Sequence, residues 1–237
     1  MAASTDDLYR VFARYPLGAA DGCPHCVNAE DQACIRSAPM RRLSAKHLGR
    51  YAFKAMTTWG TETDYKHFVP RILELAAFDG EARGYPGLEP DFVARKIVSA
   101  GWATWPDEER VVVSRFVHAL WLDAFARGSV HDLASWMETL ATLSESLEPC
   151  IEAWRRDESP RATNALVEFV LTFGDEILGS PAGGLLSDRA GEQMRLARWL
   201  LDRATRERLE RVFFDDPESP DARRCAEAAD LIGGYNL

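Results

Sequence analysis

The sequence has no long hydrophobic run, no convincing strand pattern and very little lysine. No stretch approaches the roughly 18 consecutive apolar residues of a membrane-spanning helix, so we expect no membrane partner. Only four lysines stand against 24 arginines, a bias that we attribute to genomic base composition rather than to function. The N-terminus begins without the basic and apolar regions of a secretory signal, so we expect a cytoplasmic protein.

The sequence also lacks the short motifs of common catalytic and nucleotide-binding sites. It contains no P-loop pattern, no G-x-G-x-x-G fingerprint, no H-E-x-x-H and no G-x-S-x-G. The glycine-rich stretch 179–184 follows a predicted helix and has no lysine, unlike a phosphate-binding loop. These absences argue against an enzyme, although a site formed between helices from scattered residues needs no contiguous motif.

The amino-acid composition indicates a protein with a substantial hydrophobic core and a net negative charge. The 237 residues are 46% hydrophobic and 27% charged, with a formal net charge of −9. That charge repels phosphates and anionic lipid, so we expect no nucleic-acid partner. It is compatible with a basic protein partner.

Hydrophobic periodicity predicts an all-α protein. Leu8, Val11, Phe12 and Tyr15 follow helical spacing, and Pro70 within a later stripe predicts a kink or a restart there. The expected helical segments are 6–15, 44–59, 65–78, 91–100, 106–125, 131–147, 149–156, 160–178, 188–214 and 221–231. We expect residues 1–43 to form an N-terminal helix plus an irregular cysteine-containing segment. Residues 44–237 form the predicted helical domain, with a subdivision near 179–187.

Part of this helical pattern repeats along the chain. Thr58-Trp59 recurs as Thr104-Trp105, 46 residues later, a period typical of two-helix repeats. The apolar positions that stay in phase are Leu48 with Ala94, Tyr51 with Ile97, Ala52 with Val98, and Met56 with Trp102. Residues 44–178 therefore resemble the HEAT-like or armadillo-like helical-repeat class, a resemblance that implies stacked helical hairpins. An irregular multi-helix bundle is the alternative.

The cysteines suggest a metal site. Cys23 and Cys26 form a C-x-x-C pair, and Cys34 and His47 follow downstream. Four such ligands would complete a tetrahedral structural zinc site, which would order a segment without hydrophobic periodicity. Buried or free thiols are one alternative, and a redox-active pair is another. With five cysteines in a chain of this size, we expect reduced thiols.

Two groups of residues are candidates for contact with a partner protein. Trp59 and Trp105 lie near predicted turns, where exposed indoles would be strong anchors and buried ones would fill the core. Lys66, His67 and Arg71 form a basic group that would bind a carboxylate or phosphate, or simply be a solvated helix face.

These observations favour a non-enzymatic helical scaffold that binds another protein. One concrete form is an inhibitor of the immunity type, which neutralises a toxin or effector by covering its active site. The alternative is an all-α enzyme drawing on His67, His118, Asp123 and His131. A third hypothesis is a regulator whose cysteine segment senses metal or oxidant.

Overall fold

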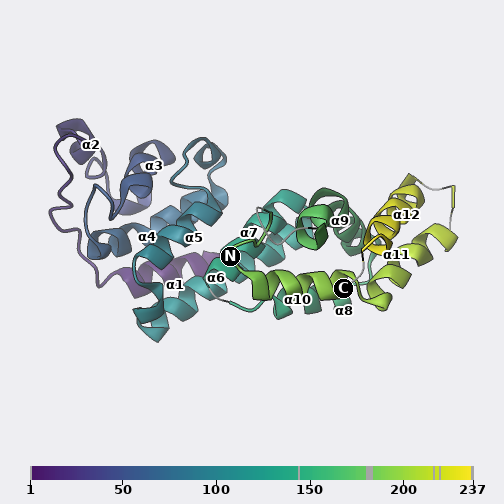
Figure 1. The fold of residues 1–237 in the computed structure, drawn as a ribbon. Coiled ribbons are helices and arrows are strands. Elements are labelled where there is room, and N and C mark those ends of the chain that lie inside the picture. The colour runs from purple at the N-terminus through teal and green to yellow at the C-terminus, as the bar shows by residue number, and fades with distance from the viewer. Residues whose placement is uncertain (1, 144, 180–183, 216, 219, 236–237) are drawn as a thin grey trace. The chain divides into compact units, whose positions relative to one another are not determined.

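In the computed structural model, the described residues are 2–143, 145–179, 184–215, 217–218 and 220–235. Within these ranges the chain forms twelve α-helices and three short 3-10 helices, and the sole β-pairings are isolated bridges at Trp59. The prediction of an all-α fold is therefore confirmed. The chain divides into two compact units, residues 1–120 and 121–237, and the boundary falls inside one helix, α6. Figure 1 shows the helices of both units.

The first unit contains five helices and the start of a sixth. In chain order they are α1 (Ala2–Phe12), α2 (Ala29–Cys34), η1 (Met40–Arg42), α3 (Ala45–Lys54), α4 (Glu62–Phe78), η2 (Gly80–Gly84), α5 (Pro90–Ser99), η3 (Trp102–Thr104) and α6 (Asp107–Arg127).

Local sequence explains where several of these helices begin. Thr61 and Asp64 form a reciprocal capping box at the start of α4, and Ser44 and His47 form another at the start of α3. Pro90 occupies the first turn of α5, where its missing N–H removes no helical hydrogen bond. These caps satisfy backbone N–H groups that the first turn of a helix leaves without partners.

Helix α4 runs without interruption through Pro70. The alternative in which the helix restarts at Pro70 is therefore wrong. Proline removes one backbone hydrogen bond, but Val69, Pro70 and Ile72 are all buried. The free energy gained by burying these apolar side chains exceeds the free energy lost with one hydrogen bond.

Aromatic rings fill the core of the first unit. Tyr51 packs edge-on against Trp59 and Phe68, with ring centroids 5.2 and 4.8 Å apart. Trp102 and Trp105 contact each other at 5.3 Å. These contacts join the segment before α4 to α4 itself and hold the turns around Trp59 and Trp105 in place.

The second unit contains the end of α6 and six further helices. They are α7 (Val130–Thr142), α8 (Glu148–Arg156), α9 (Pro160–Gly179), α10 (Ala190–Leu200), α11 (Arg203–Asp215) and α12 (Pro220–Gly233). Trp154 lies at the centre of its core, within 5.3 to 5.6 Å of the rings of Trp121, Phe125, Phe169 and Trp199.

Residues 1–43 are part of the first unit, in contrast to the predicted boundary at residue 43. The phenol of Tyr9 on α1 donates to Glu74 on α4 at 2.5 Å, and Tyr15 donates to Glu109 on α6 at 2.6 Å. Helix α1 thus packs on the same core as α4. The predicted subdivision near 179–187 includes residues 180–183, which lie outside the described residues.

Some, but not all, of the residue pairs that stay in phase in the sequence repeat have the same degree of burial. Tyr51 and Ile97 are both buried, as are Trp59 and Trp105, but Val98 is 39% exposed while Ala52 is buried. Repeat stacking stays a prediction. Among the described residues, none of the helices combines the length and apolarity that a bilayer crossing requires.

Candidate functional site

Trp59 and Trp105 belong to the core rather than to a contact surface. Each is only 2% exposed, and the indole N–H of Trp105 donates to the carbonyl oxygen of Ala100 at 2.6 Å. The alternative of exposed anchors is therefore wrong for these two residues. Both rings close turns between helices, which explains why they share a position in the repeated pattern.

Lys66 is also internal, contrary to the expectation of a basic surface group. Its ammonium lies 3.1 Å from Glu62 and 3.4 Å from Glu109, and 4.5 Å from the ring centroid of Trp105. Burial lowers the pKa of Lys66, but Glu62 and Glu109 outweigh burial and the net pKa is raised. Lys66 therefore stays charged and joins α4 to α6.

His67 and Arg71 likewise make internal contacts. The Nδ1 atom of His67 lies 2.7 Å from the carbonyl oxygen of Tyr15. Arg71 donates to the carbonyl oxygen of Leu43 at 2.7 Å and to Glu74 at 2.6 Å. These two side chains connect the N-terminal segment to α4, so the predicted basic group is a structural one.

The four candidate zinc ligands are not gathered into one group. The described residues contain no cluster of three or more histidine, cysteine, aspartate or glutamate side chains arranged to hold a metal. Nδ1 of His47 accepts a hydrogen bond from the backbone N–H of Ser44 at 3.0 Å. Cys23, Cys26 and Cys34 are free thiols of intermediate exposure. A structural zinc therefore stays a prediction.

The candidate catalytic residues each have a structural environment of their own. Burial lowers the pKa of His118, and the ring of His131 packs edge-on against Phe173. Asp123 forms an ion pair with Arg127 at 2.8 Å. A catalytic role for these residues stays a hypothesis.

The feature that stands out as a binding site is a groove in the second unit. A cavity of about 330 Å³ lies between α8 and α10, and a second of about 260 Å³ lies beside α11. The two cavities share Arg155, Trp199 and Asp202, so they adjoin each other. We call the pair of cavities the arginine groove. Its other charged lining residues are Glu148, Glu158, Arg195, Arg198, Glu207, Arg208 and Arg211.

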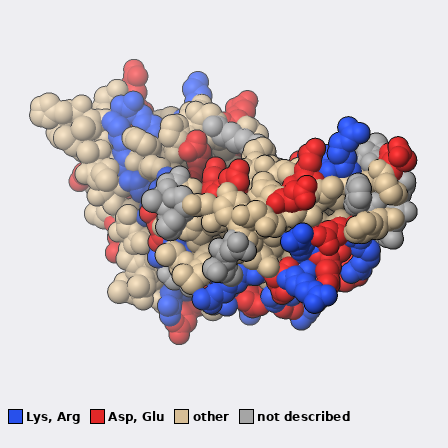
Figure 2. All heavy atoms as spheres, turned by 45° about the vertical axis from the view of Figure 1, so that its right-hand side comes forward, with Lys and Arg blue, Asp and Glu red and all other residues tan. Residues whose placement is uncertain are grey.

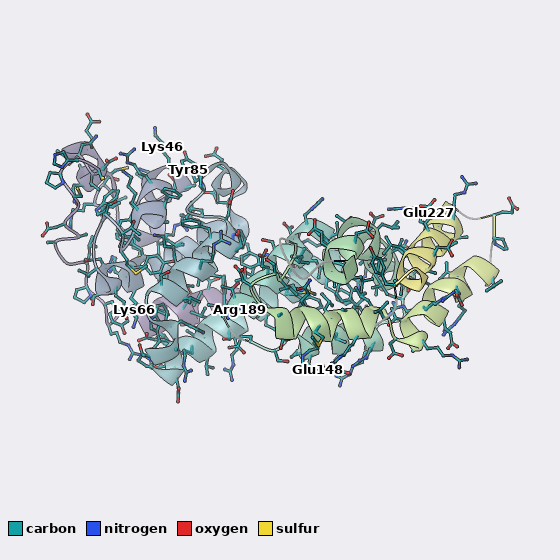
Figure 3. The ribbon with its side chains drawn as sticks, in the orientation of Figure 1. Lys46, Lys66, Tyr85, Glu148, Arg189 and Glu227 are labelled. Atoms are coloured by element: carbon teal, nitrogen blue, oxygen red, sulfur yellow. The ribbon has the colours of Figure 1, made fainter. Side chains whose placement is uncertain are left out.

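Helical spacing explains this lining. Glu148, Ile151 and Arg155 lie three and four residues apart on α8, and Gly191, Arg195 and Arg198 do so on α10, so each set forms one helix face. Glu148 on α8 is labelled at the surface of the second unit in Figure 3. Gly191 has no side chain and leaves room at one end of the groove.

Ion pairs organise part of the arginine groove. Glu148 lies 2.9 Å from Arg155 on its own helix and 3.2 Å from Arg195 on α10. Glu158 lies 3.7 Å from Arg211. Figure 2 shows positive and negative side chains intermixed over the part of the surface that the second unit forms. Such pairs hold long side chains in position but contribute little stability each.

Two arginines of the groove have no carboxylate within salt-bridge distance among the described residues. Arg208 donates at 2.6 to 2.8 Å to the carbonyl oxygens of Trp154 and Asp157 and to the hydroxyl of Thr163. Burial lowers the pKa of its guanidinium, partly offset by Glu158 and Asp157. Arg198 donates to the sulfur of Met194 at 3.3 Å. One such arginine lines each of the two cavities.

This arrangement offers charged side chains for the recognition of a ligand. Its lining residues include arginines, carboxylates and one buried indole, but no histidine, cysteine or lysine. Arginine stays protonated throughout the physiological range and presents a planar fork to carboxylates and phosphates. The groove therefore offers directional donors beside carboxylate acceptors.

Sequence reasoning missed this groove, since alternating Arg and Glu on a helix is also typical of a solvated face. It also missed an exposed phenylalanine that stacks on a half-buried one in the first unit. Phe53 is 48% exposed and stacks on Phe92 with centroids 5.3 Å apart. The available signal was that Phe53 falls outside the apolar stripe formed by Leu48, Tyr51 and Ala52.

Comparison of this chain with protein-family models, with curated proteins and with solved structures gives no match.

Proposed function

We propose that this protein is a non-enzymatic helical scaffold that binds another protein through the arginine groove. The observation that carries the proposal is the pair of adjoining cavities that share Arg155, Trp199 and Asp202. A groove between two helix faces is a common form of peptide and protein recognition.

The charges of the groove support a protein partner. Arginine is enriched at the centres of protein interfaces, where it contributes strongly to affinity. Carboxylates stand beside the arginines at Glu148, Glu158 and Asp202, so a partner would need charges of both signs. Matched charges select a partner and speed its association.

One concrete form of this function is an inhibitor that neutralises a toxin or effector by covering its active site. The formal net charge of −9 supports this form, since it would attract a basic partner over long range. Contacts in the arginine groove would then fix the orientation at short range.

The test is affinity capture of the full chain from its native lysate, with the captured proteins read by mass spectrometry. Arg198→Glu reverses a charge inside the groove. Arg223→Glu makes the same change at an exposed position on α12 and is the matched control.

We expect a stoichiometric partner to bind the unmodified chain and the Arg223→Glu variant, and to be lost from Arg198→Glu. Binding should also weaken as salt concentration rises. A partner that binds all three proteins equally would refute the groove as the contact site. The absence of any partner for a folded protein would refute the scaffold function.

A further inference from the structure

A further cavity lies in the first unit, between α4 and the irregular segments on either side of α2. Its volume is about 230 Å³, the liquid volume of about eight water molecules at ~30 Å³ each. This is smaller than the pockets of drug-sized ligands, which begin near about 300 Å³. Six apolar residues line it: Leu17, Ile35, Ala38, Met40, Leu43 and Phe68. Three of them, Ile35, Leu43 and Phe68, are each 1% exposed, so the cavity has a buried apolar floor.

The walls of this cavity are tied to α4 by hydrogen bonds from side chains to the backbone. Nδ1 of His67 lies 2.7 Å from the carbonyl oxygen of Tyr15, and Arg71 donates to the carbonyl oxygen of Leu43 at 2.7 Å. These contacts fix the segment before α2 and the segment after it. Because the cavity is already formed, a ligand would not have to order its walls on binding.

Arg36 supplies a positive charge to the lining. Its Nη2 atom donates to the carbonyl oxygens of Gly18 and Ala19 at 2.8 and 2.5 Å. A guanidinium has five N–H donors, so Nε and Nη1 keep donors beyond these two bonds. Among the described residues, no carboxylate pairs with Arg36. The exposed Arg36 therefore offers an unneutralised cation beside an apolar floor.

His67 is the second polar residue of the lining. A carbonyl oxygen can only accept a hydrogen bond, so Nδ1 of His67 donates to Tyr15 and Nε2 is the nitrogen left for a ligand. Nε2 accepts a hydrogen bond when the ring is neutral and donates when it is charged, so it can contact either form of a carboxylic acid group. The ring also packs edge-on against Phe68, with centroids 4.7 Å apart. Lys66, the neighbour of His67 on α4, is labelled in Figure 3.

We propose that this cavity binds a small apolar carboxylate, with its apolar body on the buried floor and its carboxylate at Arg36 and His67. Burial of the apolar body supplies most of the affinity, and the guanidinium selects the anion. A free acid is the occupant rather than an acidic side chain of a partner, because aspartate and glutamate have too little apolar surface to cover six apolar lining residues. The proposal is independent of the arginine groove and of the scaffold function.

The experiment titrates the full chain, labelled with ¹³C at its methionine methyl groups, with octanoate. Octanamide has nearly the same size and shape and no charge, and it is the matched ligand. Met40 lines the cavity, and its signal is assigned with Met40→Leu. Met194 on α10 is 50% exposed and contacts Arg198 of the arginine groove, so its signal reports binding elsewhere.

We expect octanoate to shift the Met40 signal with a dissociation constant of about 0.1–1 mM and to leave the Met194 signal unchanged. Octanamide should bind roughly fivefold more weakly, which is the contribution of one partly exposed ion pair.

Variants of the lining separate the charge from the apolar floor. Arg36→Gln should weaken octanoate roughly fivefold and leave octanamide unchanged, and Arg42→Gln makes the same change at an exposed position on η1 as the matched control. His67→Asn keeps a donor for the carbonyl oxygen of Tyr15, removes Nε2 and should also weaken octanoate. Ala38→Phe fills the cavity and should abolish binding of both ligands. Circular dichroism checks that each variant is folded.

Four results would overturn the proposal. They are no shift of the Met40 signal at millimolar octanoate, equal affinity for octanoate and octanamide, equal shifts of Met40 and Met194, and octanoate binding that survives Ala38→Phe. If Arg36→Gln weakened both ligands equally, Arg36 would have a structural role only and the assignment of the carboxylate to it would be wrong.

Discussion

Glu109 is the buried carboxylate on which the N-terminal packing depends, and its neutralisation gives a sharp test. The side chain is 0% exposed, accepts a hydrogen bond from Tyr15 at 2.6 Å and lies 3.4 Å from the ammonium of Lys66. Glu109→Gln keeps the shape of the side chain and removes its charge. Lys66 would then remain buried with Glu62 as its one close carboxylate among the described residues.

The magnitude follows from the separation of the charges. At 3.4 Å and an effective dielectric constant of about 20, Coulomb's law gives an attraction of ~5 kcal/mol. The substitution also removes the cost of burying a carboxylate, and Lys66 keeps Glu62. We therefore expect the free energy of unfolding to fall by about 2–4 kcal/mol, near the range measured when one partner of a buried pair is removed.

The assay is urea unfolding followed by tryptophan fluorescence and by far-UV circular dichroism. Glu108→Gln is the matched control: Glu108 is adjacent in sequence, 54% exposed and paired with Arg14 at 2.6 Å. Its loss should cost less than about 1 kcal/mol. In addition, Lys66→Met should cost less in the Glu109→Gln background than in the unmodified protein. Equal costs for Glu108→Gln and Glu109→Gln would refute the reasoning.

Three further predictions concern stability. Burial raises the pKa values of Tyr51 and Tyr65, so each contributes stability that is present below about pH 10 and falls by about 1.4 kcal/mol per pH unit above it; urea unfolding from pH 8 to 11 should show that decline, and a flat profile would contradict it. Gly87→Ala places a Cβ 2.3 Å from the backbone nitrogen of Phe53, so thermal unfolding should reveal a loss of about 1–3 kcal/mol, and an unchanged melting temperature would exclude the close approach. His47→Ala removes the acceptor that caps α3 and should cost about 1 kcal/mol in urea unfolding, whereas no change would exclude the cap.

The sequence predicted the helices because their information is local. Apolar spacing such as Leu8, Val11 and Phe12 depends on neighbours within two turns, and Ser44 and Thr61 identify helix starts by the same short-range chemistry. The local sequence could not decide whether the helix continues through Pro70. Whether a proline ends a helix depends on how much apolar surface the following turn buries, which is a property of the tertiary fold.

Candidate contact residues were harder to predict because exposure is not local. Lys66 lies one turn before Pro70 on a helix with a strong apolar stripe, and its charge predicted a solvated face. Two carboxylates instead enclose it, and one of them, Glu109, comes from 43 residues farther along the chain. Trp59 and Trp105 pose the same difficulty, since an indole near a turn suits both an interface and a core.

The arginine groove and the Cys23–Cys26 turn illustrate one physical limit. Glu148 and Arg155 are an ion pair within α8, as on many solvated helix faces. Arg195 of α10 also pairs with Glu148, so this face of α8 forms one wall of the groove. A C-x-x-C pair likewise supplies two thiols, and the groups around it decide its chemistry. Nδ1 of His47 is hydrogen-bonded to Ser44, whereas Lys54 lies against the turn. The thiolate is both the nucleophile and the metal ligand, so the chemistry of the pair depends on which further groups the tertiary fold brings to it, and the motif does not specify those groups.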